Sequence, residues 1–113
     1  MKRSNEPIPW ALFGAGGMLL ALIGPGLVLA TGFLLPFAEP SRAFQAIDAI
    51  VAEPAGKLFI LALIALPLFH TVHRLYHGMH DLHVPLPRPL RLALCYGTAT
   101  LLSVVSGSWL LLL

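Results

Sequence analysis

Charged side chains are scarce in this chain. Lys, Arg, Asp and Glu make up only 11% of its 113 residues, and 58% of the residues are hydrophobic. Soluble domains average about 25% charged residues, so the composition excludes an ordinary soluble domain and favours a protein of the lipid bilayer. The seven Lys and Arg residues are scattered around apolar segments and form no basic patch. We therefore expect no nucleic-acid partner.

The chain holds a single cysteine, Cys95, which excludes an internal disulfide. One cysteine also cannot supply the set of thiolates that holds an iron–sulfur cluster. A nucleotide-binding glycine turn would lie between a strand and a helix, but the glycines of segment 14–17 fall inside a long apolar run. We therefore expect no catalytic activity from this chain alone.

Three apolar segments are long enough to cross a bilayer, which takes about 20 residues of helix. They cover residues 10–37, 57–77 and 92–113, and the second reaches this length only if its helix continues past Arg74. The first is longer than the apolar core of a signal peptide, about 7–15 residues, so we interpret it as an uncleaved anchor. The sequence predicts an all-α membrane protein, a single domain over residues 1–113 with three transmembrane helices.

Basic residues predict the orientation of these helices, because Lys and Arg accumulate on the cytoplasmic side. One side of the three-span arrangement carries five of them: Lys2, Arg3, Arg74, Arg88 and Arg91. The other side carries Arg42 and Lys57. We expect a cytoplasmic N-terminus and a periplasmic C-terminus.

The loop between the first two spans also has a helical pattern. Ser41, after Pro40, is a candidate N-cap, and apolar residues recur from Phe44 to Val51 with helical period. We expect a short amphipathic helix that ends near Pro54. Residues 84–89 alternate with proline and are expected to be extended.

Small residues recur along the first span. They are Gly14, Gly17, Ala21, Gly24 and Gly32. Small side chains allow close approach of helices in lipid, so we expect this stripe to pack against a partner within the membrane.

Histidines gather where the second span ends: His70, His73, His77 and His80 fall within about 80° of one helix face. Four imidazoles spread over about 15 Å of helix cannot share one metal ion, although His73 and His77, with Asp81, could. A haem would take His70, the deepest of the four, and would need its second ligand from a partner.

A quinone site is the third interpretation of this segment. Quinone chemistry moves protons with electrons, so it needs a proton-carrying donor, a cation and an aromatic wall. His73, Arg74, Tyr76 and His77 supply these groups at the end of the second span, and Trp10 adds to the aromatic wall from the start of the first. Such side chains also anchor helices at the membrane interface without any further role.

Two stretches resemble a known family. They are Lys2–Met18 (KRSNEPIPWALFGAGGM) and His73–Leu82 (HRLYHGMHDL). Both are similar to the D-subunit of bacterial quinol:fumarate reductase, the smaller of its two hydrophobic membrane-anchor subunits. The three-span layout and the length of the chain agree with this resemblance.

The resemblance implies a multi-pass protein of the bacterial inner membrane. Its partners would be the flavoprotein subunit that carries FAD, the iron–sulfur subunit and the larger membrane-anchor subunit. Electrons would come from menaquinol bound near the cytoplasmic face, without haem or metal in this chain. Carried over by position, the quinone-binding residues are Trp10, Phe13, Gly14, His73, Arg74 and His77.

Two residues of the matching motif, His80 and Asp81, are candidates for docking the soluble subunits together with His77. His70 lies outside the motif and receives no family role. Two other functions stay open: the anchor of a haem b-containing succinate dehydrogenase, and a histidine-lined metal-binding or transport protein.

Overall fold

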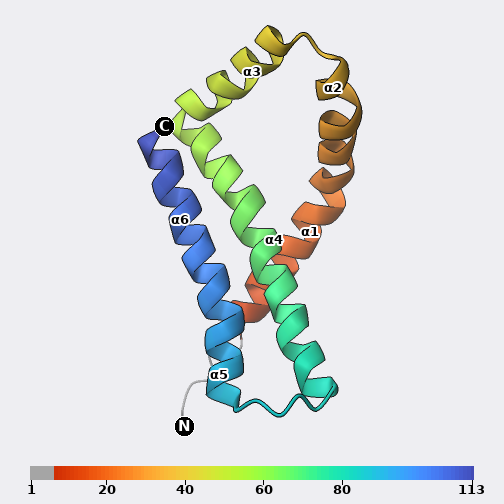
Figure 1. The fold of residues 1–113 in the computed structure, drawn as a ribbon, viewed down its shortest axis with the longest axis vertical. Helices are drawn as coiled ribbons and strands as arrows, with labels where there is room; N and C mark the ends of the chain where they lie inside the picture. Colours follow the sequence, from red (N-terminus) through yellow and green to blue (C-terminus); the bar gives the residue numbers. More distant parts are fainter. Residues whose placement is uncertain (1–6) are drawn as a thin grey trace.

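The computed structural model describes residues 7–113, and every regular element in that range is helical. In chain order these elements are α1 (Pro7–Leu29), a π-helical turn (Ala30–Leu34), α2 (Leu35–Phe37), α3 (Pro40–Ala52), α4 (Pro54–Asp81), α5 (Arg88–Leu92), a second π-helical turn (Ala93–Gly97) and α6 (Thr98–Leu112). Figure 1 shows their arrangement.

Three continuous helical stretches are long and apolar enough to span a membrane, which confirms the predicted all-α architecture. They are Pro7–Phe37, Pro54–Asp81 and Arg88–Leu112. Each begins before the predicted span, with a proline in its first turn or just ahead of it. Proline is tolerated there because the first amides of a helix have no partner within the helix. Pro89 is therefore helical, and the expected extended segment ends at Pro87.

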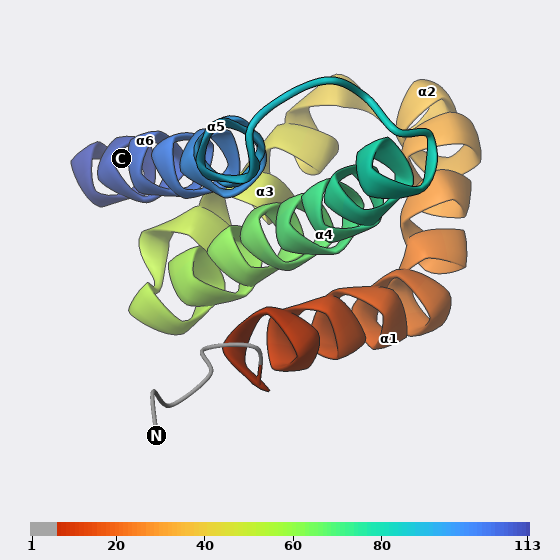
Figure 2. The same ribbon diagram turned by 90° about the horizontal axis from the view of Figure 1, so that it is seen from below.

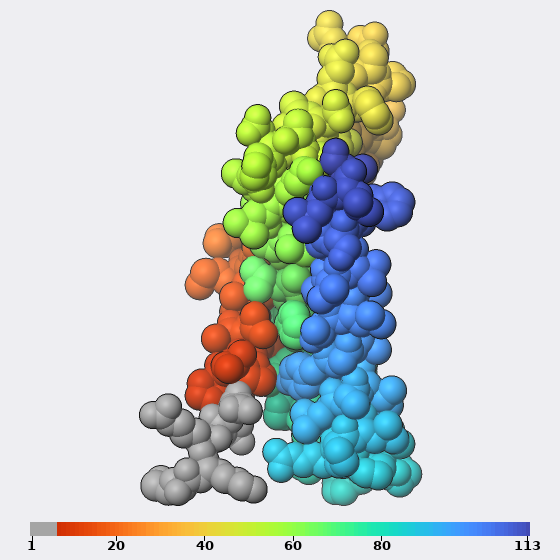
Figure 3. Space-filling view, turned by 90° about the vertical axis from the view of Figure 1, so that its left-hand side faces the viewer, coloured from red at the N-terminus to blue at the C-terminus, as the bar shows by residue number. Residues whose placement is uncertain are grey.

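Helix α4 lies between α1 and α6 (Figure 2). Helix α1 crosses α4 near the middle of α4, and α6 runs beside α4 and diverges from it toward α5 (Figure 1). From the side, atoms of α1 and α6 flank those of α4 (Figure 3). The start of α1, the end of α4 and α5 consequently meet at one end of the molecule, and the C-terminus lies toward the other.

The tightest contact between α1 and α4 is made by a glycine that the small-residue stripe does not include. A Cβ added to Gly16 would clash with the carbonyl oxygen of Leu66 and lie 2.7 Å from Cβ of His70. Of the stripe itself, Gly17 faces the His70 ring, at 3.0 Å from an added Cβ, whereas Gly24 has open space. At the crossing of α1 and α4, Gly16 is therefore the residue in closest contact. Most of the predicted stripe has no neighbour within the described part of this chain.

The expected amphipathic helix is α3, but its start differs from the prediction. Helix α3 begins at Pro40, and Glu39 occupies the N-cap position without a side-chain hydrogen bond. Ser41 was therefore the wrong cap, because the fixed φ of Pro40 suits the first helical position. On the apolar face of α3, the Phe44 side chain is 71% exposed, so α3 contributes little to the packing within this chain.

Candidate functional site

His73 lies at the meeting point of the three long helices. It is only 5% exposed and is the one buried polar side chain among residues 7–113. Its ring centroid is 5.3 Å from that of Trp10 and 4.8 Å from that of Phe13, both on α1. The His77 ring, one turn along α4, is 4.5 Å away. The sequence-predicted pairing of the first span with the end of the second is thus a direct contact.

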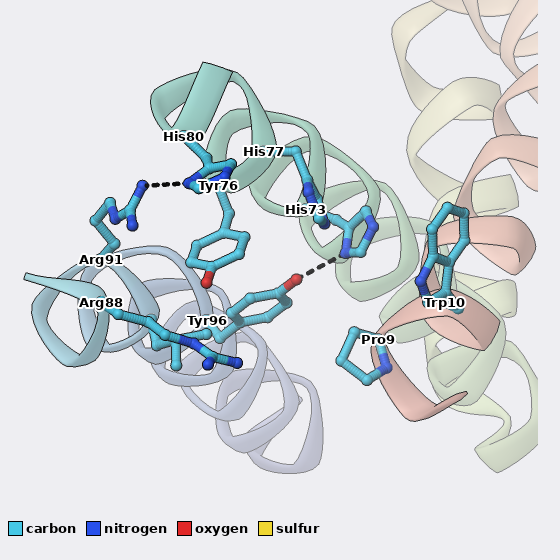
Figure 4. Close-up of a pocket in the computed structure, with 10 residues that line it drawn as sticks. Pro9, Trp10, His73, Tyr76, His77, His80, Arg88, Arg91 and Tyr96 are labelled. Carbon is cyan, nitrogen blue, oxygen red and sulfur yellow. Dashed lines mark hydrogen bonds between the residues drawn. The ribbon is translucent and has the colours of Figure 1, made fainter. Parts of the chain in front are cut away.

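The third long helix reaches His73 through Tyr96. A hydrogen bond of 2.7 Å joins the Tyr96 hydroxyl and Nδ1 of His73 (Figure 4). In the same view the other ring nitrogen of His73 lies on the side of Trp10. Because the hydroxyl holds Nδ1, the orientation of the imidazole is fixed and Nε2 is directed away from α6.

Tyr96 belongs to the π-helical turn Ala93–Gly97 that joins α5 to α6. Such a turn weakens the regular backbone ladder, and here a neighbouring side chain compensates. The Thr98 hydroxyl donates to the carbonyl oxygens of Leu94, at 2.5 Å, and Cys95, at 2.9 Å. Cys95, within this turn, is buried as a free thiol.

His70 packs α1 on α4. Its Nδ1 donates a hydrogen bond of 2.9 Å to the carbonyl oxygen of Phe13, and its ring stacks on the Phe13 ring with centroids 4.4 Å apart. Gly16 and Gly17 approach the same side chain. The contacts of His70 are therefore those of a helix-packing residue.

A pocket of about 360 Å³ opens on one side of His73. Seven residues line it: Trp10, Phe13, His73, Arg74, His77, Gly78 and Asp81. We call it the Arg74 pocket. It gathers all but one of the residues predicted to bind a quinone. The exception is Gly14, which is outside the lining and has nothing within 4 Å of an added Cβ, so it presents bare backbone one residue beyond Phe13.

A larger pocket, of about 740 Å³, opens on the other side of His73 (Figure 4). Its lining consists of Pro9, Trp10, His73, Tyr76, His77, His80, Arg88, Arg91, Leu92 and Tyr96. We call it the tyrosine pocket. Within it, the Arg91 guanidinium lies 5.7 Å from the centre of the Tyr76 ring and 3.4 Å from Nδ1 of His80.

Tyr96 and Arg91 were not predicted as site residues, because the prediction was confined to the histidine motif and the first span. The signal that could have found them was depth: both lie at the start of the third span, at the same end of the molecule as the histidines. The histidine row itself divides. His70 packs helices and His73 is central, while His77 and His80 are exposed at the pocket rims. Across the described range no three His, Cys, Asp or Glu side chains gather as ligands for one metal ion.

Comparison with known proteins assigns the chain to a family. The sequence profile of the fumarate reductase D-subunit matches residues 1–112. The chain belongs to the fumarate reductase D-subunit family. The fumarate reductase D-subunit of Shewanella sp. (strain W3-18-1) is 41% identical over 113 residues, which cover 97% of this chain and 93% of the relative. The proteins of the same name from Vibrio cholerae serotype O1 (strain M66-2) and Aliivibrio fischeri (strain MJ11) are 40% and 39% identical over 108 residues. These cover 93% of this chain and, respectively, 82% and 89% of the relatives.

As a fumarate reductase D-subunit, the chain is a small membrane-anchor protein of an oxidoreductase complex and not its catalytic component. Its three apolar helices agree with this role. The resemblance carried by Lys2–Met18 and His73–Leu82 is confirmed over nearly the whole chain. Membership in a fumarate reductase complex also implies that quinone chemistry takes place in the assembly.

Proposed function

We propose that this chain anchors a bacterial fumarate reductase in the inner membrane and forms part of its menaquinol site. The partners are the flavoprotein subunit with FAD, the iron–sulfur subunit and the larger membrane-anchor subunit. The observation that carries the proposal is the placement of His73. It is buried where α1, α4 and α6 meet, and it also lines a pocket shared with Trp10 and Arg74.

The distribution of basic residues supports a cytoplasmic position for this site. Arg74, Arg88 and Arg91 lie at the end of the molecule that holds both pockets, whereas Arg42 and Lys57 lie on α3 and at the start of α4. Such an imbalance is typical of the cytoplasmic side. The predicted contributions of Lys2 and Arg3 lie outside the described residues. We infer that the C-terminus faces the periplasm.

The side chains of the Arg74 pocket fit a quinol. A bound quinol supplies two electrons and two protons. Nε2 of His73 is free of α6 and is suited to take a proton from a ring hydroxyl, since Nδ1 is held by Tyr96. The Arg74 guanidinium stabilises the negative charge that develops on the ring oxygen. Trp10 and Phe13 form an aromatic wall, and bare backbone at Gly14 leaves room beside it.

The site is incomplete without the rest of the complex. Trp10 is 58% exposed although it lies 5.3 Å from His73, so one side of the aromatic wall is uncovered in this chain. We propose that the iron–sulfur subunit and the larger anchor close this side and exclude water from the quinol. His77, with His80 and Asp81, lies at the rim, where it contacts either the quinol or the docked soluble subunits.

The test is His73→Ala in the assembled four-subunit complex. We expect quinol oxidation to fall by about 100-fold, as is usual when a group that transfers protons is lost. Fumarate reduction by an artificial soluble electron donor should stay near normal, because that route bypasses the membrane site. The control is His83→Asn, a histidine beyond the end of α4 that lines neither pocket.

Two results would contradict the proposal. If both activities fall together, His73 serves assembly. If neither falls, His73 has no part in quinol oxidation and the site must lie elsewhere in the complex.

A further inference from the structure

We propose that Tyr96 is a positioning and proton-relay residue of the quinol site, and that the tyrosine pocket is the route by which a proton leaves His73. This inference rests on the proposed function, in which the His73 imidazole takes a proton from quinol at Nε2. It adds a third helix to the site and gives the larger pocket a role.

The first argument is the hydrogen bond at Nδ1 of His73. The His73 side chain is only 5% exposed, and the quinol and partner subunits would cover it further. The Tyr96 hydroxyl is the one group among the described residues that hydrogen-bonds to the His73 ring, and the distance of 2.7 Å is that of a strong contact. A proton that leaves His73 from Nδ1 therefore has the Tyr96 hydroxyl as its acceptor.

The second argument is the chemistry of the hydroxyl. A phenol donates one hydrogen bond and accepts others, so Tyr96 can accept the Nδ1 proton while it releases its own. In this step a quinol O–H bond breaks and an N–H bond forms at Nε2 of His73. The Nδ1–H proton moves to the Tyr96 oxygen, and the hydroxyl proton passes to water in the tyrosine pocket. The electrons leave separately, to the iron–sulfur subunit.

The third argument is the backbone at Tyr96. The π-helical turn Ala93–Gly97 interrupts an otherwise regular third span just where Tyr96 faces α4. Single π-helical turns inside α-helices occur often at functional sites, because the extra residue redirects a side chain. Cys95 and Ala99, in and next to this turn, are closely packed, so the direction of Tyr96 is held by its neighbours.

The fourth argument is the lining of the tyrosine pocket. Beyond Tyr96 the pocket offers His77 and His80 on α4 together with Tyr76, all able to exchange protons with water. Its volume of about 740 Å³ is ample for several waters. The pocket lies at the polar end of the spans, so the proton reaches the same side of the membrane as the soluble subunits.

The experiment compares Tyr96→Phe with the matched control Thr100→Val in the assembled complex. Both remove one hydroxyl from α6 or the turn before it, but the Thr100 hydroxyl bonds only to the Tyr96 carbonyl oxygen, at 2.7 Å. For Tyr96→Phe we expect kcat for quinol oxidation to fall by about 10-fold or more, with KM for quinol within about twofold. Activity with the artificial soluble donor should stay normal in both variants.

Two further readouts separate proton relay from structural support. Added imidazole, small enough to enter the tyrosine pocket, should restore turnover of Tyr96→Phe in proportion to its concentration. The double variant His73→Ala/Tyr96→Phe should be no slower than His73→Ala alone, because the two residues act in one chain of transfers. If Tyr96→Phe does not assemble, Tyr96→His, which retains a donor and an acceptor, takes its place and should stay active.

A normal kcat for Tyr96→Phe, combined with a slow His73→Ala complex, would overturn the relay and leave the quinol site intact. A raised KM without a change in kcat, or no response to imidazole, would likewise overturn it. Full activity of His73→Ala would instead refute the proposed function on which the relay depends.

Discussion

Substituting Gly16 by alanine should move α1 away from α4 and impair the proposed quinol site, although Gly16 lines neither pocket. The new Cβ would lie 2.7 Å from Cβ of His70 and would also clash with the Leu66 carbonyl. Ordinary contacts between carbon atoms are about 3.5–4.0 Å, so the two helices must separate by about 1 Å. Because the clash is partly with backbone, no side-chain rotation relieves it.

The cost follows from this separation. The hydrogen bond from His70 to the Phe13 carbonyl, now 2.9 Å, would lengthen beyond the usual limit of about 3.2 Å. Overpacking costs about 1–3 kcal/mol and the lost hydrogen bond about 1 kcal/mol, so we expect the complex to lose about 2–4 kcal/mol of stability. Trp10 and Phe13 would also move away from His73, which should lower quinol turnover.

The assay is thermal unfolding of the purified complex, with quinol turnover measured on the same preparation. Gly26→Ala is the control, because nothing lies within 4 Å of an added Cβ there and a mid-helix alanine gains about 0.5–1 kcal/mol. Gly17→Ala should fall between the two, since its Cβ meets only the His70 ring, at 3.0 Å. If Gly16→Ala melted and turned over like Gly26→Ala, the packing described for α1 and α4 would be wrong.

Two further predictions concern His70 and His83. His70→Phe keeps the aromatic stack on Phe13 but removes the side-chain hydrogen bond to the Phe13 carbonyl oxygen, so thermal unfolding should show a loss of about 1 kcal/mol. Activity with the artificial donor should stay normal, and an unchanged unfolding midpoint would contradict the structural role of His70. His83 has a positive φ of 53° just after the end of α4, a conformation that favours glycine. His83→Gly should therefore stabilise the complex by up to about 1 kcal/mol without altering quinol turnover. A lower midpoint of thermal unfolding would contradict this prediction.

Composition and periodicity were enough to predict the three spans and the contact between the start of the first span and the end of the second. A run of apolar residues without charges that is long enough to cross the bilayer is nearly always a membrane helix. Trp10 lies at the start of the first span and His73 near the end of the second, so both are expected at the same membrane interface. Most of the Arg74 pocket could therefore be predicted from two short stretches of sequence.

Other details depend on geometry that no spacing in the sequence encodes. Which glycine of α1 touches α4 is decided by the crossing of the two helices, and the crossing favours Gly16 over the regular stripe. Tyr96 belongs to a π-helical turn, which shifts the helical register by one residue. Regular helical spacing therefore does not predict that Tyr96 faces His73. The sequence offered Ser41 as the N-cap of α3, but the helix begins one residue earlier, at Pro40, because the fixed φ of proline suits the first helical position.

The two halves of helix α1 differ in their contact with α4. Before Pro25 in the sequence, α1 is held against α4 by the close approach of Gly16 and by the hydrogen bond from His70. After Pro25, the backbone passes through the π-helical turn Ala30–Leu34 and separates from α4 (Figure 1). Large apolar side chains of the second half, such as Val28 and Phe33, are exposed. Another membrane helix can therefore pack against this second half without displacing the contacts that hold Trp10 beside His73.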